Sequence, residues 1–295
     1  MAKWVGKTRG GVAGYSIFIF VLKNFNIKAA YFVLRFVAAY FLFTKQPGIN
    51  YYFRQRLGYS RFKAFVSKYK NFYVFGQVLL DKVALMAGIS KKFTFEFEGE
   101  NHLHNMANSG TGGVLIGAHV GNWEIAGQLL ERINCPVHIV MLDAEHKKIK
   151  NMLDSVMKEK SMNIIPIKND FSHIVAIAEA LKNKEIVAIH GDRYLPGTNA
   201  VSVNFLGEDA LFPAGPLYLA SKYEVPVTFV SAMKETATHY HFFATKPKQY
   251  KYPANLKTRK QEIATMVTDY VEELERVVKK YPLQWFNYYQ FWEKM

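Results

Sequence analysis

The stretch Val114-Leu-Ile-Gly-Ala118, followed at once by His119-Val-Gly-Asn-Trp-Glu124, decides the fold class of this 295-residue chain. Its first five residues form a short apolar run, which is typical of a buried strand. Three more runs of this kind follow, at 137–142, 164–167 and 186–189. Because stretches with helical patterning separate the runs, we predict an α/β fold with a mostly parallel central sheet and helices on both faces.

Further strands and helices extend this pattern. A strand with period-two alternation is predicted at 93–98, and two more at 226–232 and 240–245, the last nearer an edge of the sheet. Helices are predicted over 60–87, 121–133, 145–160, 171–183, 217–224 and 257–280.

The positive charge is concentrated at the N-terminus. The chain has 38 Lys and Arg against 24 Asp and Glu. Residues 1–80 contain thirteen of these bases and no acid, whereas the remaining residues are almost neutral. Such asymmetry indicates binding to an anionic surface or to nucleic acid.

Two apolar runs within this basic region, 12–22 and 29–43, distinguish the two partners. Neither reaches the ~20 residues that a bilayer span needs, and no small-residue cleavage site follows the first, so we do not expect a cleaved signal peptide. Aromatic-rich runs bracketed by bases favour a helical hairpin seated in one membrane leaflet, with the bases at anionic head groups. The alternative is a soluble helical cap whose aromatics pack on the core. We predict membrane-associating helices in 1–45 and an α/β domain in 46–295.

Nucleic acid is not expected as a partner. Proteins that bind it usually present aromatic side chains singly beside Arg, whereas Ser16–Leu22 is a continuous apolar block. Neither a phosphate-binding loop nor a Gly-x-Gly-x-x-Gly pattern is present, so no nucleotide cofactor is predicted. The single cysteine, Cys135, excludes a disulfide framework and fits a reducing compartment.

Polar clusters follow two of the predicted strands, at the strand ends where catalytic groups of α/β sheets gather. The first contains His119, Asn122 and Glu124, and the second is His190-Gly-Asp-Arg193. Asn122 suits a helix N-cap and Glu124 its first turn, so the carboxylate could accept the imidazole N–H and orient His119 as a general base. The alternative is a capped helix beside an ordinary loop histidine, because His-x4-acid is a weak pattern alone.

The same strand ends allow other chemistry. His119, His190 and Asp192 could form a metal site in a metal-dependent hydrolase, although no His-x-His or His-x-x-x-His pair exists among these residues. We therefore predict no metal. A non-catalytic membrane-binding protein would explain the basic N-terminus and leave both polar clusters unexplained.

The longer string Gly117-Ala-His-Val-Gly-Asn-Trp-Glu-Ile-Ala-Gly127 resembles the signature of the bacterial late acyltransferases of lipid A biosynthesis. These enzymes are the lauroyl/myristoyl branch of the lysophospholipid acyltransferase superfamily. The resemblance extends over essentially the whole chain, to Gly191-Asp-Arg193, Val203–Glu208, Phe212–Pro216 and Pro282-Leu-Gln-Trp-Phe286. The Phe291-Trp292 ending departs from the more basic C-terminus of the better-known members.

The resemblance implies acyl transfer from an acyl carrier protein or coenzyme A thioester to a lipid acceptor, such as a lipid A precursor or a lysolipid. The location it implies is the cytoplasmic face of the bacterial inner membrane. His119 would remove the acceptor proton and Glu124 would orient it, the pair that forms the family's His-x4-Glu motif. No acyl-enzyme is expected, because Gly-x-Ser-x-Gly is absent and Cys135 reads as an inert thiol.

Substrate-binding candidates are Asn122, Asp192, Arg193 and Glu208. Arg193 is favoured for a phosphate or pantetheine contact, because guanidinium pairs bidentately with phosphate, and Asp192 is expected to position it. A structural ion pair at the strand end is the alternative for these two. Glu208 is carried by the resemblance alone.

Overall fold

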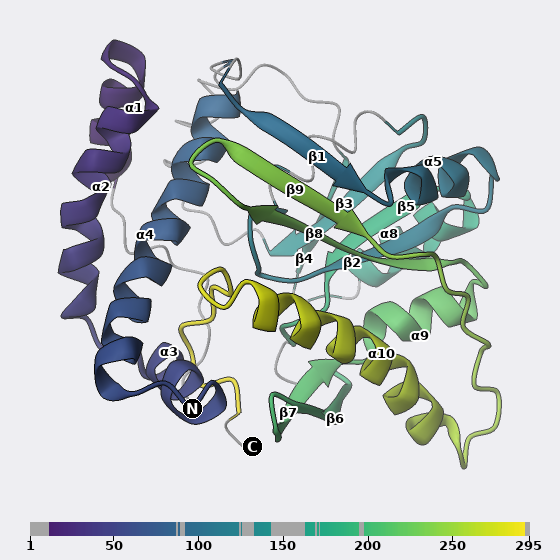
Figure 1. Cartoon of the computed structure of the whole chain (residues 1–295). Coiled ribbons are helices and arrows are strands. Elements are labelled where there is room, and N and C mark those ends of the chain that lie inside the picture. Colours follow the sequence, from purple (N-terminus) through teal and green to yellow (C-terminus); the bar gives the residue numbers. More distant parts are fainter. Residues whose placement is uncertain are drawn as a thin grey trace.

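A seven-stranded sheet runs through the centre of the molecule in the order β1-β9-β8-β2-β5-β3-β4 (Figure 1). The computed structural model describes residues 12–86, 88, 92–123, 125, 133–142, 163–168, 170, 172–194 and 198–292. The strands are β1 (Thr94–Glu98), β2 (Gly113–Gly117), β3 (Val137–Leu142), β4 (Asn163–Ile167), β5 (Ile186–His190), β8 (Val227–Lys234) and β9 (His239–Ala244). Only the β8–β9 pair is antiparallel in this sheet, so the predicted α/β class with a mostly parallel sheet is confirmed.

Helices cover both faces of the sheet, as its buried strands require. The predicted helices appear as α4 (Arg61–Met86), α8 (Ser172–Lys182), α9 (Gly215–Lys222) and α10 (Arg259–Lys280). Successive side chains of β2 point to opposite faces: Val114 and Ile116 join the core that includes α9 and α10, whereas Leu115 meets Met106 of α5 (Glu100–Asn108). The helices predicted over 121–133 and 145–160 lie almost entirely outside the described residues.

An antiparallel hairpin, β6 (Ala200–Phe205) and β7 (Glu208–Pro213), was not anticipated from the sequence, and neither was α5. The two-residue turn of the hairpin is Leu206-Gly207, and both residues have positive φ. This backbone suits tight hairpins, but its usual sequence signal is Asn-Gly or Asp-Gly. Leucine at the first position hid the turn.

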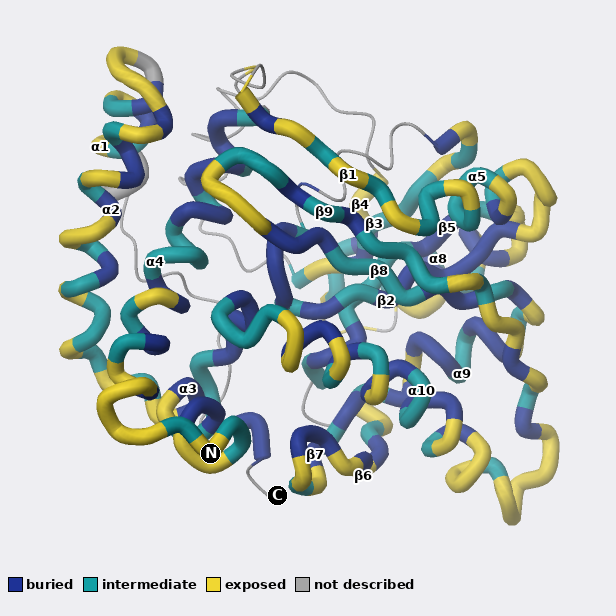
Figure 2. Tube along the Cα trace, viewed as in Figure 1, coloured by how far each residue is buried: buried dark blue, intermediate teal, exposed yellow. Residues whose placement is uncertain are grey.

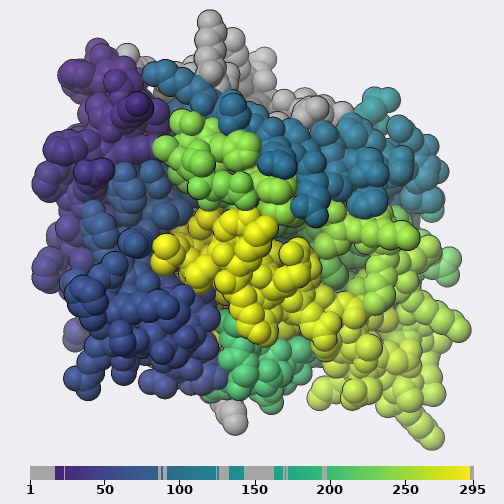
Figure 3. Space-filling view, in the orientation of Figure 1, coloured from purple at the N-terminus to yellow at the C-terminus, as the bar shows by residue number. Residues whose placement is uncertain are grey.

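The N-terminal helices α1 (Val12–Asn24) and α2 (Ile27–Leu42) lie along α4 at one flank of the molecule (Figures 1 and 3). Asn26 caps α2 by accepting the Ala29 N–H. Helices α2 and α4 approach closely where Leu34 of α2 covers Gly76 of α4, since a Cβ at position 76 would lie 2.4 Å from a Leu34 methyl carbon. The boundary predicted near residue 45 stays a prediction.

Exposed and buried residues alternate along α2 (Figure 2), with one face against α4 and the other open. No single helix in the described part of the chain has the length and hydropathy of a bilayer span. The segments 27–42 and 47–56 have them only when taken together, across an 89° bend. The second segment comprises α3 (Pro47–Tyr51) and the π-helical turn η1 (Tyr52–Arg56).

Candidate active site

The two polar clusters predicted at strand ends meet in the structure. Strands β2 and β5 are parallel neighbours, with Gly117 opposite His190 in the register. The carboxyl ends of adjacent parallel strands lie at the same edge of a sheet. The loop that carries His119 therefore emerges beside the loop that carries Asp192.

Asp192 binds His119 through both carboxylate oxygens. Oδ1 lies 2.8 Å from Nδ1 of the imidazole, and Oδ2 accepts the main-chain N–H of His119 at 3.0 Å. Because an ionised carboxylate can only accept, Nδ1 carries a proton, and in the neutral form of the ring Nε2 is the basic nitrogen. The Asp192 side chain is 2% exposed and that of His119 is 16% exposed. The pair thus presents an oriented imidazole with a basic nitrogen, the arrangement of a general base.

The surroundings fix the charge of Asp192 and of His190, the two titratable groups beside His119. Burial by itself would raise the pKa of Asp192, but His119 and Arg193 outweigh it and hold that pKa well below its usual range. Burial, together with His119, lowers the pKa of His190 to about 3. At neutral pH the site therefore contains an ionised Asp192 and a neutral His190.

Aromatic rings surround His119. The His190 ring centroid lies 4.5 Å away and that of Trp123 lies 5.1 Å away, both in edge-on arrangements. Trp123 and His190 also contact each other, at 5.5 Å between centroids. These contacts restrict the imidazole to the rotamer that faces Asp192.

The backbone of the His119 loop is tied to β8 and to the C-terminal segment. Gly121 donates to Gln284 O at 2.9 Å, and Phe286 N donates to His119 O at 2.9 Å. Gly121 has a φ of +59°, and a Cβ there would lie 2.0 Å from Ala232 O, so only glycine fits. The Pro282–Phe286 block of the resemblance therefore supports the loop that holds the base.

Asn122 makes the hydrogen bond that is typical of a helix N-cap, as its residue type predicted. Its Oδ1 accepts the Ile125 N–H at 3.3 Å, and its Nδ2 donates to Val78 O and to the Tyr240 hydroxyl. The residue is fully buried. This geometry gives Asn122 a structural role, and its predicted substrate contact stays a prediction.

Arg193 and Glu208 are engaged with protein groups. The Arg193 guanidinium donates to Phe286 O at 3.1 Å and lies over the Tyr289 ring. Glu208 accepts from the Tyr51 hydroxyl at 2.6 Å and pairs with Arg56 at 3.0 Å, in the β6–β7 hairpin. Their predicted roles in substrate binding stay predictions.

Two carboxylates of the predicted site, Glu124 and Asp192, need separate comment. Glu124, the predicted partner of His119, lies outside the described residues. Asp192 was expected to position Arg193, but it binds His119 directly. The sequence placed Asp192 after a strand, yet only the adjacency of β2 and β5 reveals which residue it contacts.

One polar atom from each of His119, His190 and Asp192 lies within 4.8 Å of the others, a spacing compatible with a metal ion. The two Asp192 oxygens, however, already accept the two N–H groups of His119. A metal bound through Asp192 and Nδ1 would compete with these hydrogen bonds. The observed contacts fit a hydrogen-bonded acid–base pair better than a ligand set.

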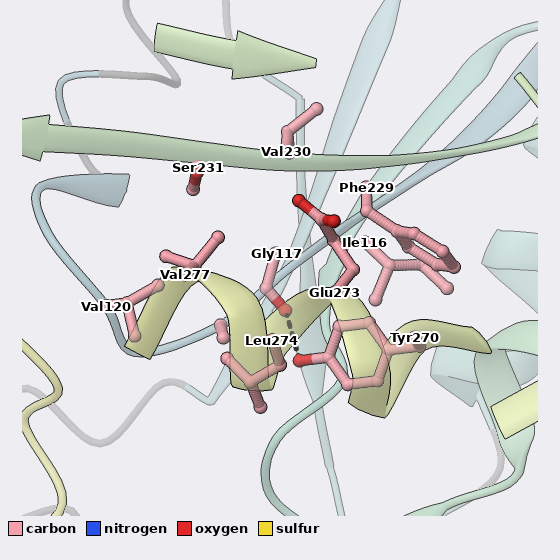
Figure 4. A pocket seen from close by; sticks show the side chains of 11 residues that line it. Ile116, Gly117, Val120, Phe229, Val230, Ser231, Tyr270, Glu273, Leu274 and Val277 are labelled. Carbon is pink, nitrogen blue, oxygen red and sulfur yellow. Dashed lines mark hydrogen bonds between the residues drawn. The ribbon is translucent and has the colours of Figure 1, made fainter. Parts of the chain in front are cut away.

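A narrow cavity of about 20 Å³ lies behind the end of β2, beneath α10 (Figure 4). Tyr270 closes one side and donates to Gly117 O at 2.9 Å, and Glu273 and Ser231 supply polar atoms. This volume holds about one water molecule. The hydrogen bond from Tyr270 to Gly117 O holds the end of β2, from which the His119 loop leaves.

Comparison with known proteins gives the family context. The family described as bacterial lipid A biosynthesis acyltransferase matches residues 68–294. Phosphatidylinositol mannoside acyltransferase, from two strains of Mycobacterium tuberculosis, is 27% identical over 123 residues, which are 41% of this chain and 39% of that protein. The chain thus matches about two-fifths of the length of these curated relatives.

Among solved structures, the 1-acyl-sn-glycerophosphate (LPA) acyltransferase PlsC from Thermotoga maritima aligns with 84% of this chain and 98% of its own. The sequence identity is 14% and the TM-score is 0.38.

Proposed function

Because the chain belongs to the bacterial lipid A biosynthesis acyltransferase family, we propose that it transfers a fatty acyl chain from an acyl thioester to a lipid acceptor, with His119 as the general base. The observation that carries the proposal is the two-point contact between Asp192 and His119 at the end of β2. This contact favours the imidazole tautomer with the proton on Nδ1, in which Nε2 is the basic nitrogen. Among the described residues, Asp192 is the carboxylate that we propose orients the base.

The proposed reaction needs no acyl-enzyme. Nε2 of His119 takes the proton of an acceptor hydroxyl or amine while the acceptor atom attacks the thioester carbonyl carbon. The tetrahedral intermediate then expels the thiolate, which recovers the proton from His119. The products are an ester or amide and a free thiol, and Asp192 stabilises the imidazolium that forms between the two steps.

The site can carry out this chemistry without a second ionisable base. His190 stays neutral at physiological pH because burial lowers its pKa to about 3. A neutral imidazole beside His119 adds no repulsion when His119 becomes protonated. Trp123 packs edge-on against both rings and helps to hold them in place.

We extend the proposal to a membrane surface, where a lipid acceptor resides. Helices α1 and α2 and the residues that follow them carry exposed large apolar side chains, here called the aromatic face: Phe20, Phe25, Phe32, Phe36, Tyr40 and Phe43. Each of them is more than half exposed, and exposed large apolar side chains that gather on a protein surface mark interaction sites. Phe62 and Phe65, near the start of α4, are also exposed.

Charge supports the same surface. Lys28 and Arg35 lie on α2, and no acid is present among the first 80 residues. Each base near an anionic lipid surface contributes about 1 kcal/mol, and salt screens this contribution. The proposed location is the cytoplasmic face of the cell membrane, with the aromatic face inserted at head-group level.

The activity is tested with purified protein, a lysolipid or lipid A precursor in vesicles, and matched acyl carrier protein and acyl coenzyme A donors. Mass spectrometry should find a product heavier by one acyl chain, and the faster donor identifies the physiological thioester class. Total lipids from cells with and without the protein should differ by the same species. Absence of an acylated product with both donors would contradict the proposal.

Membrane binding is tested by flotation with phosphatidylglycerol and phosphatidylcholine vesicles. The intact chain should float with both and more strongly with the anionic vesicles, and high salt should remove only that excess. Replacing Phe32 and Phe36 together with serine should weaken flotation on both, whereas Leu256→Ser, an exposed apolar residue before α10, is the matched control. Equal flotation of the two variants would contradict the assignment of the aromatic face.

A further inference from the structure

Four buried polar residues form a second cluster, here called the Asp81 network. They are Tyr31 of α2, Asp81 of α4, Lys234 at the end of β8 and Tyr240 of β9. Asp81 and Tyr240 are fully buried, and Tyr31 and Lys234 are less than a tenth exposed. The cluster therefore joins the N-terminal helix pair to the sheet through groups that solvent does not reach.

Every polar group of the Asp81 network has a partner. Asp81 Oδ1 accepts from the Tyr31 hydroxyl, and Oδ2 accepts from the Tyr240 hydroxyl and from Lys234 Nζ, the last at 2.5 Å. Lys234 Nζ also donates to the Tyr31 oxygen at 3.2 Å and to Ala237 O at 2.6 Å. A buried network that is satisfied in this way fixes the relative positions of its members.

The network reaches the His119 loop by two routes. The Tyr240 hydroxyl accepts from Asn122 Nδ2 at 3.2 Å, and Asn122 follows the loop directly. The Gln284 side chain bonds both main-chain polar groups of Lys234, at 2.9 and 2.7 Å, and Gln284 O accepts the Gly121 N–H. The route through Asn122 and the route through Gln284 thus both reach the backbone next to His119.

A buried ion pair is a costly way to gain stability, because desolvation offsets most of the Coulomb attraction. Burial raises the pKa of Asp81 against the opposing effects of Lys234, Tyr240 and Tyr31. Burial likewise lowers the pKa of Lys234 against the effect of Asp81. An apolar cluster of the same volume would join α2 and the sheet at lower cost but would not fix hydrogen-bond directions.

We propose that Tyr31, Asp81, Lys234 and Tyr240 are positioning residues that align the His119 loop with helix α2. This inference rests on the proposed function of His119. Tyr31 is the residue that α2 contributes, so the alignment of the base depends on how α2 is seated on α4. The helix that carries half of the aromatic face and the loop that carries the base are thereby coupled through one buried carboxylate.

The chain offers a matched pair of variants. Tyr31→Phe removes the hydroxyl between Asp81 and Lys234 and keeps the ring. Tyr69→Phe removes another hydroxyl from the same α2–α4 interface, one that donates to Arg35 O at 3.4 Å. Tyr240→Phe cuts the path at its other end, toward Asn122.

Turnover is measured with full-length protein at a temperature well below the melting point of every variant, so that all are folded. Tyr31→Phe and Tyr240→Phe should each lower kcat roughly five- to tenfold with little change in KM, and Tyr69→Phe should resemble wild type. The double variant Tyr31→Phe/Tyr240→Phe should lose less than the product of the two single losses, since both act through Asp81. Hydrogen exchange at the Gly121 amide should be faster in Tyr31→Phe than in Tyr69→Phe.

Each outcome decides one question. Wild-type kcat and unchanged Gly121 exchange in Tyr31→Phe would overturn the inference, and so would equal losses in Tyr31→Phe and Tyr69→Phe. Multiplicative losses in the double variant would also overturn it. His119→Ala is assayed in parallel: if it keeps wild-type turnover, the proposed function fails, whereas an inactive His119→Ala beside a fully active Tyr31→Phe rejects only the positioning role.

Discussion

Asp192 and Asp81 are both buried carboxylates with a basic partner, yet they lie in regions with different access to solvent. The partner of Asp192, His119, is 16% exposed, whereas the side chain of Lys234, the partner of Asp81, is 4% exposed. The net pKa shifts are opposite: electrostatic partners lower the pKa of Asp192, and burial raises that of Asp81. The comparison suggests a division of roles: the carboxylate with a partly exposed partner suits chemistry, and the carboxylate whose partners are all buried suits architecture.

The largest effect should come from the accessible member of the first pair. His119→Ala should lower turnover by about 10²–10⁴-fold and leave the fold intact, because a positioned base is lost. His104→Ala, an exposed histidine of α5, is the control. Steady-state assays with an acyl thioester and circular dichroism of both variants check this, and near-native turnover of His119→Ala would end the assignment of the base.

The closed pair should respond in stability. Lys234→Met leaves Asp81 without its cation and should lower the free energy of unfolding by about 3 kcal/mol, which is roughly 10²-fold in the folding equilibrium. Lys234→Met/Asp81→Asn should recover part of this loss because no buried charge remains. Urea unfolding measures both, and an unchanged midpoint for Lys234→Met would remove the distinction between the two regions.

The orienting carboxylate should matter less than the base it holds. Asp192→Asn should lower kcat by about 10²-fold, since the imidazole remains but its tautomer is no longer fixed. The matched variant is Glu124→Gln, which tests the carboxylate predicted from the sequence spacing. A larger loss in Glu124→Gln than in Asp192→Asn would make Glu124 the principal orienting group.

The smallest effect, taken per unit of pH, concerns acid stability near the site. Burial lowers the pKa of His190 to about 3, below the value near 6.5 of the unfolded chain. Between these values only the unfolded state binds the proton, so stability should fall by about 1.4 kcal/mol per unit as the pH is lowered from about 6.5 to 3.

Replacing this histidine isolates its contribution. His190→Gln should flatten the dependence of unfolding free energy on pH in that window, because glutamine does not titrate. Denaturant unfolding between pH 4 and 7 measures the slope for both proteins. Identical slopes would mean that His190 is accessible to protons in the folded state.

Local patterns predicted much of the fold for physical reasons. The strands at 93–98, 137–142 and 164–167 lie within one residue of their predicted bounds, because alternation and branched apolar runs directly reflect burial. The helical spacing of apolar residues over 257–280 likewise predicted α10. The β6–β7 hairpin was not predicted because its turn has leucine, in place of the usual Asn or Asp, at a position of positive φ.

The candidate site was predicted in part. His119 and Asp192 were recognised because both follow buried strands, and the capping role of Asn122 follows from its residue type. The pairing of His119 with Asp192 was missed because the two are 73 positions apart. No periodicity within either segment reports that β2 and β5 are neighbours.

The sequence alone determined the α/β class, the family resemblance, the polar residues at two strand ends and the basic apolar N-terminus, because each depends on composition or on spacing within one segment. Only the tertiary structure decided that Asp192 holds His119, that Glu208 pairs with Tyr51 and Arg56, and that Asp81 joins α2 to the His119 loop. Sheet order and helix docking bring these groups together. They depend on the packing of the whole core, which short-range patterns do not encode.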